Sequence, residues 1–296
     1  MSEFDAEVLV FPTVELPGEV DALTLPAAAI PQPPRPLPWR RWLAQPRLLS
    51  LATVVALLAL WWLVTALQLV PPLFLPSPQA VLGKFHQVAT VGYMDATLWQ
   101  HLNASLARVA VALLAASLTA IPLGILLGRS RRARAIGDPI IEFYRPLPPL
   151  AYLPLIVIWF GIGELSKILL IYLAIFAPVV ISTMAGVSAV APDRLRAAQA
   201  LGANPRQLLW YVVLPSALPD ILTGMRIGLG TGWSTLVAAE LIAATQGLGF
   251  MVQSAANFLV TDVVVLGILV IGAVAVGLEL LIRALQRRLT PWQGKV

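Results

Sequence analysis

Cysteine is absent from the 296-residue sequence, and histidine occurs only twice. The chain therefore cannot form a disulfide, use a thiolate as a nucleophile or bind a metal through cysteine. Charged residues are also scarce, at 12% of the chain against about 25% in soluble domains. Hydrophobic residues make up 58% instead. This balance excludes an ordinary soluble domain and indicates a polytopic membrane protein.

Motifs for chemistry are missing as well. No G-x4-G-K-[ST] sequence is present, so a nucleotide would have to bind elsewhere. The glycines at 228, 230 and 232 are a poor dinucleotide match because no strand precedes them. His86 and His101 are too isolated for a metal site, and no hydroxyl, histidine and carboxylate cluster suggests a catalytic triad. We therefore predict no catalytic residue, no metal ligand and no enzyme activity in this chain.

Long apolar runs dominate what is present, and a membrane-spanning helix needs about 20 such residues. Six runs qualify, at approximately 48–67, 102–128, 140–161, 167–187, 217–241 and 263–282. The third contains Pro146, Pro148, Pro149 and Pro154, so this span must be irregular and buried in protein or beside a cavity. A loop rich in small and polar residues is expected between the last two spans. The predicted fold is all-α with six transmembrane helices.

Basic residues indicate the orientation. Fifteen of the twenty lie on the two tails and on the loops after spans two and four, whereas only Lys84 and Lys167 lie on the other side. These bases flank apolar spans, which favours a topology signal over nucleic-acid binding. The positive-inside rule then predicts that both termini are cytoplasmic. The fifteen are Arg35, Arg40, Arg41, Arg47, Arg129, Arg131, Arg132, Arg134, Arg194, Arg196, Arg206, Arg283, Arg287, Arg288 and Lys295.

Composition divides the chain into successive segments. Residues 1–47 are acidic and then proline-rich, which predicts a disordered cytoplasmic tail. The first transmembrane helix, 48–67, is followed by a periplasmic segment at 68–101. A five-helix core at 102–283 contains a polar cytoplasmic loop at 188–216, and a basic cytoplasmic tail occupies 284–296.

The polar loop carries its own helix signals. Pro192 and Asp193 can open a short helix, Gly202 can adopt the left-handed turn that closes it, and Asn204 followed by Pro205 can cap a second helix. Two short helices joined at a glycine are therefore expected between apolar spans.

The spacing in this loop resembles the conserved cytoplasmic loop of ABC-importer permeases, E-A-A, three residues, G, nine residues, I-x-L-P. The matching positions here are Arg196, Ala197, Ala198, Gly202, Val212, Leu214 and Pro215. The resemblance implies that the first short helix docks on a separate ATPase and couples its motion to transport. Arg196 stands where glutamate is usual, which reverses a charge, and Val212 stands where isoleucine is usual.

Four further stretches resemble the nitrate, sulfonate and taurine branch of ABC permeases, and most of all the permeases of taurine importers. They begin at Met94, Asp138, Gly232 and Arg283. The resemblance implies a type I ABC-importer permease fold in a bacterial inner membrane. It also implies a second copy of this chain, two ATPase subunits that bind ATP and Mg²⁺, and a periplasmic binding protein that delivers the substrate.

Charged groups at membrane depth are candidates for function, because each costs about 2.5–3.5 kcal/mol to insert. We expect most of them to form structural pairs or to lie at the membrane interface. The spacing of Glu142 and Arg145 permits a pair, and Glu279 is expected to pair with Arg283. Arg226, with the hydroxyls of Ser234 and Thr235, is the candidate substrate pathway for an anion. Glycines at 224, 228 and 232 predict close helix contact. The full set of charged candidates is Arg108, Glu142, Arg145, Arg226, Glu240 and Glu279.

Other functions remain open from sequence. The same machinery could carry nitrate or another small anion or sulfur compound. A self-contained secondary transporter would show paired broken helices in inverted repeats, and only one proline-broken span is visible. An intramembrane enzyme would need an acid-base or metal cluster. Co-purification with an ATPase would separate the first class from the other two.

Overall fold

The computed structural model describes residues 46–292, so the expected tail at 1–47 lies almost entirely outside it. The chain divides into two compact units, Met1–Ala56 and Leu57–Val296, and each is considered by itself. The division falls within the first described helix, α2 (Pro46–Ala66). Among the described residues every regular element is helical, which confirms the all-α prediction.

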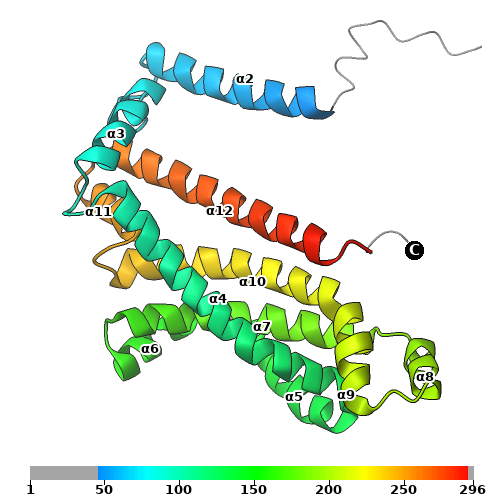
Figure 1. The fold of residues 1–296 in the computed structure, drawn as a ribbon. Helices are drawn as coiled ribbons and strands as arrows, with labels where there is room; N and C mark the ends of the chain where they lie inside the picture. Colours follow the sequence, from blue (N-terminus) through cyan, green and yellow to red (C-terminus); the bar gives the residue numbers. More distant parts are fainter. Residues whose placement is uncertain (1–45, 293–296) are drawn as a thin grey trace, which may run out of the picture. The chain divides into compact units, whose positions relative to one another are not determined.

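Five helical stretches in the described part are long and apolar enough to cross a membrane. They contain α2, α4 (Leu98–Arg129), α7 (Glu164–Ser188), α10 (Leu214–Ala243) and α12 (Thr261–Leu289) (Figure 1). The stretch containing α10 begins earlier, at Pro205, because α9 (Pro205–Gln207) and a π-helical turn η2 (Leu208–Val213) run directly into it. The remaining elements are shorter: α3 (Pro78–Thr90), α5, η1, α6, α8 (Pro192–Ala200) and α11 (Leu248–Asn257).

The third expected span, at 140–161, is broken as its prolines predicted. It consists of the end of α5 (Arg131–Tyr144), a 3-10 turn η1 (Pro149–Tyr152) and α6 (Leu153–Phe160). Pro149 begins η1 and Pro154 lies in the first turn of α6, positions where the missing N–H removes no intrahelical bond, so both prolines favour the start of a new helical piece. The third expected span is therefore a series of short helical pieces, and none of these pieces alone is among the five stretches long enough to cross a membrane.

Helix α7 is the centre of the larger unit and packs along both α4 and α10. On the α4 side, Gly124 and Gly128 lie so close to Thr183 and Val187 that an added Cβ would meet them at 2.6 and 2.7 Å. The missing side chains allow the two backbones to approach. This contact lets α4 and α7 share one buried core with α10 and α12.

The glycine series on α10 faces the other side of α7. A Cβ at Gly224 would meet Ser182 at 2.6 Å, and one at Gly232 would meet Ile175 at 2.6 Å. The predicted close helix contact at these glycines is confirmed. Small residues on both of its neighbours thus hold α7 between α4 and α10.

The connection between the last two spans is not only a loop. It contains α11, whose Leu248, Met251 and Ala255 are completely buried against the core. The expected loop of small and polar residues is present at 244–247, but the sequence analysis missed the amphipathic helix formed by the following ten residues. α8 and α11 lie at opposite ends of α10 (Figure 1).

Candidate functional site

The polar loop folds as its local signals predicted. α8 begins with Pro192, and Asp193 lies in its first turn. Gly202 has a φ of 83°, and the N–H groups of Gly202 and Ala203 donate back to the carbonyls of Gln199 and Ala198 at 2.9 and 3.1 Å. This pair of bonds closes the helix in a Schellman motif, which requires a left-handed residue at the glycine position.

Asn204 then opens the next helix with a reciprocal cap. Its side chain accepts a bond from the Gln207 N–H at 2.9 Å, and the Gln207 side chain accepts one from the Asn204 N–H at 2.9 Å. Pro205 occupies the first helical position, where its missing N–H removes no intrahelical bond. The turn between α8 and α9 is therefore specified at both helix ends.

Most of α8 is exposed. Leu195 packs against the buried cluster formed by the end of α7 and the start of α10, which anchors the helix. Arg196 and Asp193 form an exposed ion pair at 3.4 Å, which contributes little because solvent screens it. Ala197 is exposed, Ala198 is half-buried, and Leu201 is 89% exposed. The short helix thus presents a polar surface with one unusually exposed leucine.

Leu214 and Pro215, the other two residues of the predicted coupling set, lie on α10 rather than α8. Both are half-buried, and Leu214 packs against the same cluster that anchors Leu195. Their place suggests support for the loop, whereas Arg196, Ala197 and Gly202 lie on or beside its exposed helix. The spacing motif therefore combines an exposed helix with the residues at its base.

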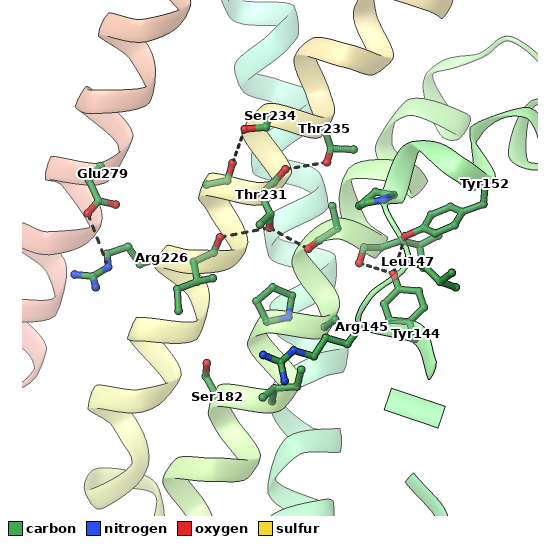
Figure 2. Close-up of a pocket in the computed structure, with 18 residues that line it drawn as sticks. Tyr144, Arg145, Leu147, Tyr152, Ser182, Arg226, Thr231, Ser234, Thr235 and Glu279 are labelled. Carbon is green, nitrogen blue, oxygen red and sulfur yellow. Dashed lines mark hydrogen bonds and ion pairs between the residues drawn. The ribbon is translucent and has the colours of Figure 1, made fainter. Parts of the chain in front are cut away.

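A cavity of about 830 Å³ lies along the middle of α7 and α10 (Figure 2). It is bordered by the end of α5, by η1 and by Glu279 on α12 as well. All three residues of the predicted substrate pathway, Arg226, Ser234 and Thr235, line it. Sequence reasoning had not placed its other polar residues there: Tyr144, Arg145, Tyr152, Ser182, Thr231 and Glu279.

The charged residues of this cavity are unevenly paired. Arg226 Nε lies 3.8 Å from Glu279 Oε1, a partner on α12 that the sequence had not identified. Glu279 also accepts a hydrogen bond from Arg283 Nε at 2.7 Å, which confirms that predicted pair. The pair that the spacing of Glu142 and Arg145 permits does not form in the described chain. Within the described residues Arg145 has no ion pair, because it caps α5 and its side chain lies at the cavity.

Most hydroxyls that line the cavity already donate a hydrogen bond to a backbone carbonyl. Thr235 donates to the Thr231 carbonyl at 2.8 Å, and Ser234 donates to the Gly230 carbonyl at 3.2 Å. A hydroxyl has only one hydrogen, so in this conformation neither offers a donor to an anion. Tyr144 likewise donates to the Leu173 carbonyl at 2.6 Å. Ser234 and Thr235 therefore line the cavity without presenting the donors that their hydroxyls suggested.

A second polar cluster lies near the far end of α10, beside α11. Arg108 on α4 donates to Glu240 on α10 at 2.5 Å and to Glu164 on α7 at 2.6 and 2.9 Å. Arg108 is 5% exposed and Glu240 is completely buried. Lys167 extends the cluster with a 2.7 Å bond to Glu164. The expectation that Arg108 and Glu240 have structural partners is confirmed, although the sequence did not predict that they pair with each other.

The turn before α11 completes this cluster through its backbone. Glu240 accepts bonds from Ser105 Oγ at 2.8 Å and from the Gly249 N–H at 2.9 Å. Arg108 donates to the Gln246 carbonyl at 2.7 Å, and the Gly247 N–H donates to His101 Nδ1 at 3.1 Å. Four chain segments thus meet at one buried ion cluster, where every charge has an opposite partner.

Sequence comparison places the chain among known transport proteins. Residues 120–292 match the family described as binding-protein-dependent transport system inner membrane component. The chain is 65% identical to the taurine transport system permease protein TauC of Escherichia coli, over 88% of this chain and 96% of that protein. It is 35% identical to a putative aliphatic sulfonates transport permease protein, SsuC of Bacillus subtilis, over 80% and 85% respectively.

Solved structures support the same fold. An amino acid ABC transporter chain aligns with a TM-score of 0.54 at 19% identity, over 71% of this chain and 96% of the other. At this identity the likeness shows the fold alone. The family match and the TauC relative identify a transport component of the inner membrane rather than an enzyme, in a family whose members work with an ATPase and a substrate-binding protein. The chain belongs to the inner-membrane permease components of binding-protein-dependent ABC transport systems.

Proposed function

We propose that this chain is the membrane subunit of an ATP-driven importer that carries taurine or a related sulfonate into the cytoplasm. The observation that carries the proposal is the 65% identity to a taurine transport permease over nearly the whole length of both chains. The cavity supports it chemically, because two arginines line a space between membrane helices and one of them, Arg145, has no ion pair among the described residues, where an uncompensated cation is costly. A permanently anionic sulfonate could pass beside such cations.

Coupling to the ATPase is assigned to α8. Arg196 and Ala197 on α8, and Leu201 directly after it, are exposed in the part of the chain that the structure describes. ATP and Mg²⁺ would bind to the ATPase, and closure of two ATPase subunits would move α8. Because Leu195 joins α8 to the ends of α7 and α10, that movement would reach the two helices that line the cavity.

The orientation and assembly follow from charge and geometry. The concentration of bases at the two tails and at the α8 end supports our proposal that this end is cytoplasmic. The periplasmic binding protein would then deliver substrate at the α11 end. We further propose a pair of identical permease chains, since the cavity of one chain opens on its surface and a second copy would enclose the path.

Uptake into proteoliposomes tests the function. The permease would be reconstituted with its ATPase and binding protein, and uptake of labelled taurine, an alkanesulfonate and nitrate compared with ATP or ADP supplied to the ATPase. The proposal expects ATP-dependent uptake of taurine or the alkanesulfonate in preference to nitrate. Nitrate uptake alone would contradict the substrate class, and equal uptake without the ATPase would indicate a self-contained transporter.

The matched variants are Arg226→Gln, inside the cavity, and Arg287→Gln, on α12 outside its lining. Arg226→Gln should reduce uptake about tenfold, the scale of one lost charge-assisted hydrogen bond. Arg287→Gln should leave uptake near the wild-type rate. Equal rates in all three proteins would remove Arg226 from the pathway.

A further inference from the structure

The cavity contains one carboxylate beside its cations, and this group needs an explanation. Arg145 comes from the end of α5, Arg226 from α10 and Glu279 from α12. A passage for a simple anion gains nothing from a carboxylate, because like charges repel more strongly away from bulk water. A ligand that carries both signs of charge would use all three residues.

Only one oxygen of Glu279 is occupied. Oε1 accepts the hydrogen bond from Arg283 and is also the atom nearest to Arg226. In the part of the chain that the structure describes, Oε2 accepts no hydrogen bond. The side chain is 37% exposed at the cavity. An ionised carboxylate can accept bonds at both oxygens, so Oε2 remains available to a donor from a ligand.

Donors for an anion remain free on the other walls. Arg226 forms an ion pair with Glu279 at 3.8 Å but no hydrogen bond, so its N–H groups can still donate to a ligand, and Arg145 has no ion pair among the described residues. The hydroxyl of Ser182 on α7 also has no hydrogen bond within the described chain, unlike those of Ser234 and Thr235. Figure 2 shows Ser182, both arginines and Glu279 around the same cavity.

We propose that this cavity recognises both ends of a zwitterionic aminosulfonate. Arg145, Arg226 and Ser182 bind the sulfonate, and Oε2 of Glu279 binds the ammonium group. The inference rests on the proposed import of sulfonates and adds a selection step within the membrane subunit. Taurine, which is 2-aminoethanesulfonate, carries both groups at neutral pH.

This arrangement would bind ligands that share a sulfonate with different affinities, depending on their other end. Ethanesulfonate has the same anionic end and nearly the same length but no ammonium, so it cannot use Glu279. A binding site whose polar group is left without its partner rejects the ligand that lacks it, because the desolvated group gains nothing in return. Taurine should therefore bind more tightly than ethanesulfonate to the permease itself.

Equilibrium binding of labelled taurine and ethanesulfonate to the purified permease–ATPase complex tests this, with the binding protein omitted because it selects substrates independently. Glu279→Gln keeps the size of the side chain but loses its charge. This variant should weaken taurine binding at least about tenfold, the scale of one charge-assisted hydrogen bond. Its affinity for ethanesulfonate should stay within about twofold of the wild type. Arg145→Gln should weaken the binding of both ligands.

Arg283→Gln is the matched control for the structural role of Glu279. It removes the partner on the same helix but does not line the cavity. Taurine affinity should be unchanged in this variant. If Glu279→Gln fails to assemble, Glu279→Asp serves instead, since its shorter side chain withdraws the charge from the cavity and should also weaken taurine selectively.

Two results would overturn the inference: an equal change for both ligands in the Glu279 variants, or no difference between the ligands in the wild type. Neither result bears on uptake by the complete transporter, so the import function could stand while this inference fails. Absence of sulfonate uptake by the complete transporter would instead overturn the proposed function.

Discussion

Arg108 on α4 and Glu240 on α10 form a 2.5 Å ion pair in which both side chains are almost completely buried. Glu240 depends on this pair for charge neutralisation more than Arg108 does. Arg108 also binds Glu164 through two nitrogens, whereas Arg108 is the only cation paired with Glu240 in the described chain. Removing the arginine therefore leaves a buried carboxylate alone, while neutralising Glu240 leaves the arginine paired.

Arg108→Met should be severely destabilising. Breaking a buried ion pair from one side costs about 3–5 kcal/mol, because the remaining charge loses its partner in a desolvated site. The change should appear as a lower free energy of unfolding in mixed micelles and as lower membrane abundance. Arg134→Met is the control, since its pair with Asp138 is exposed and should contribute less than about 1 kcal/mol.

Glu240→Gln should destabilise less than Arg108→Met, because Glu164 still neutralises the arginine. The amide oxygen can still accept from the Gly249 N–H. Comparing the two variants in the same unfolding assay checks this asymmetry. A larger loss for Glu240→Gln would mean that Glu164, which is 57% exposed, does not compensate Arg108.

Gly247→Ala should disturb the same cluster through the backbone. Gly247 has a φ of 137°, which side chains rarely allow, and an added Cβ would collide with the Glu240 carboxylate. Both effects should lower the free energy of unfolding, in total by about 2 kcal/mol or more. Gly272→Ala on α12 is the control, since its Cβ would meet open space in an ordinary helix. It should be neutral or slightly stabilising.

Local features of this fold could be predicted from sequence. The length of the apolar runs predicted the long helices, and the prolines predicted that the segment at 140–161 is broken. The order of Gly202, Asn204 and Pro205 predicted the end of one helix and the start of the next. Each of these sequence signals affects only residues close to it, through φ restriction, capping or hydrophobic length. The structures that they specify can therefore be predicted without knowledge of the tertiary structure.

Long-range partners could not be predicted. Arg108 and Glu240 are 132 positions apart, and Arg226 finds Glu279 on another helix rather than the nearby Asp220. The hydroxyls of Ser234 and Thr235 were placed correctly at the cavity, yet their bonds to backbone carbonyls depend on rotamers that spacing does not specify. Charge at membrane depth indicated that Arg108, Arg226 and Glu240 need partners, but sequence spacing identified a partner only within one helix, for Glu279 and Arg283.

Topology can be tested with single cysteines because the natural chain has none. A cysteine at Ala256, exposed at the end of α11, should react with a membrane-impermeant thiol reagent added from the periplasm. One at Ala203, beside α8, should react only after the membrane is permeabilised. The reverse pattern would invert the orientation inferred from the distribution of arginine and lysine.

Gly202→Val should uncouple the ATPase while leaving the membrane core intact. A valine Cβ would meet open space, so the cost comes from the φ of 83°, about 1 kcal/mol or more for a β-branched residue. The strain falls on the two bonds that close α8, which should then shift or fray relative to its anchor at Leu195. Substrate-stimulated ATP hydrolysis by the complete transporter should fall severalfold at normal membrane abundance.

Gly202→Asn separates backbone strain from loss of glycine as such. Asparagine tolerates the left-handed conformation better than valine, so it should retain most of the stimulated hydrolysis. Because a Cβ at position 202 would meet no atom within 4 Å, we expect a difference between the two variants to arise from the turn. If valine and asparagine both support wild-type hydrolysis and uptake, the ATPase does not depend on how α8 ends, and the coupling role proposed for Arg196, Ala197 and Ala198 loses its structural basis.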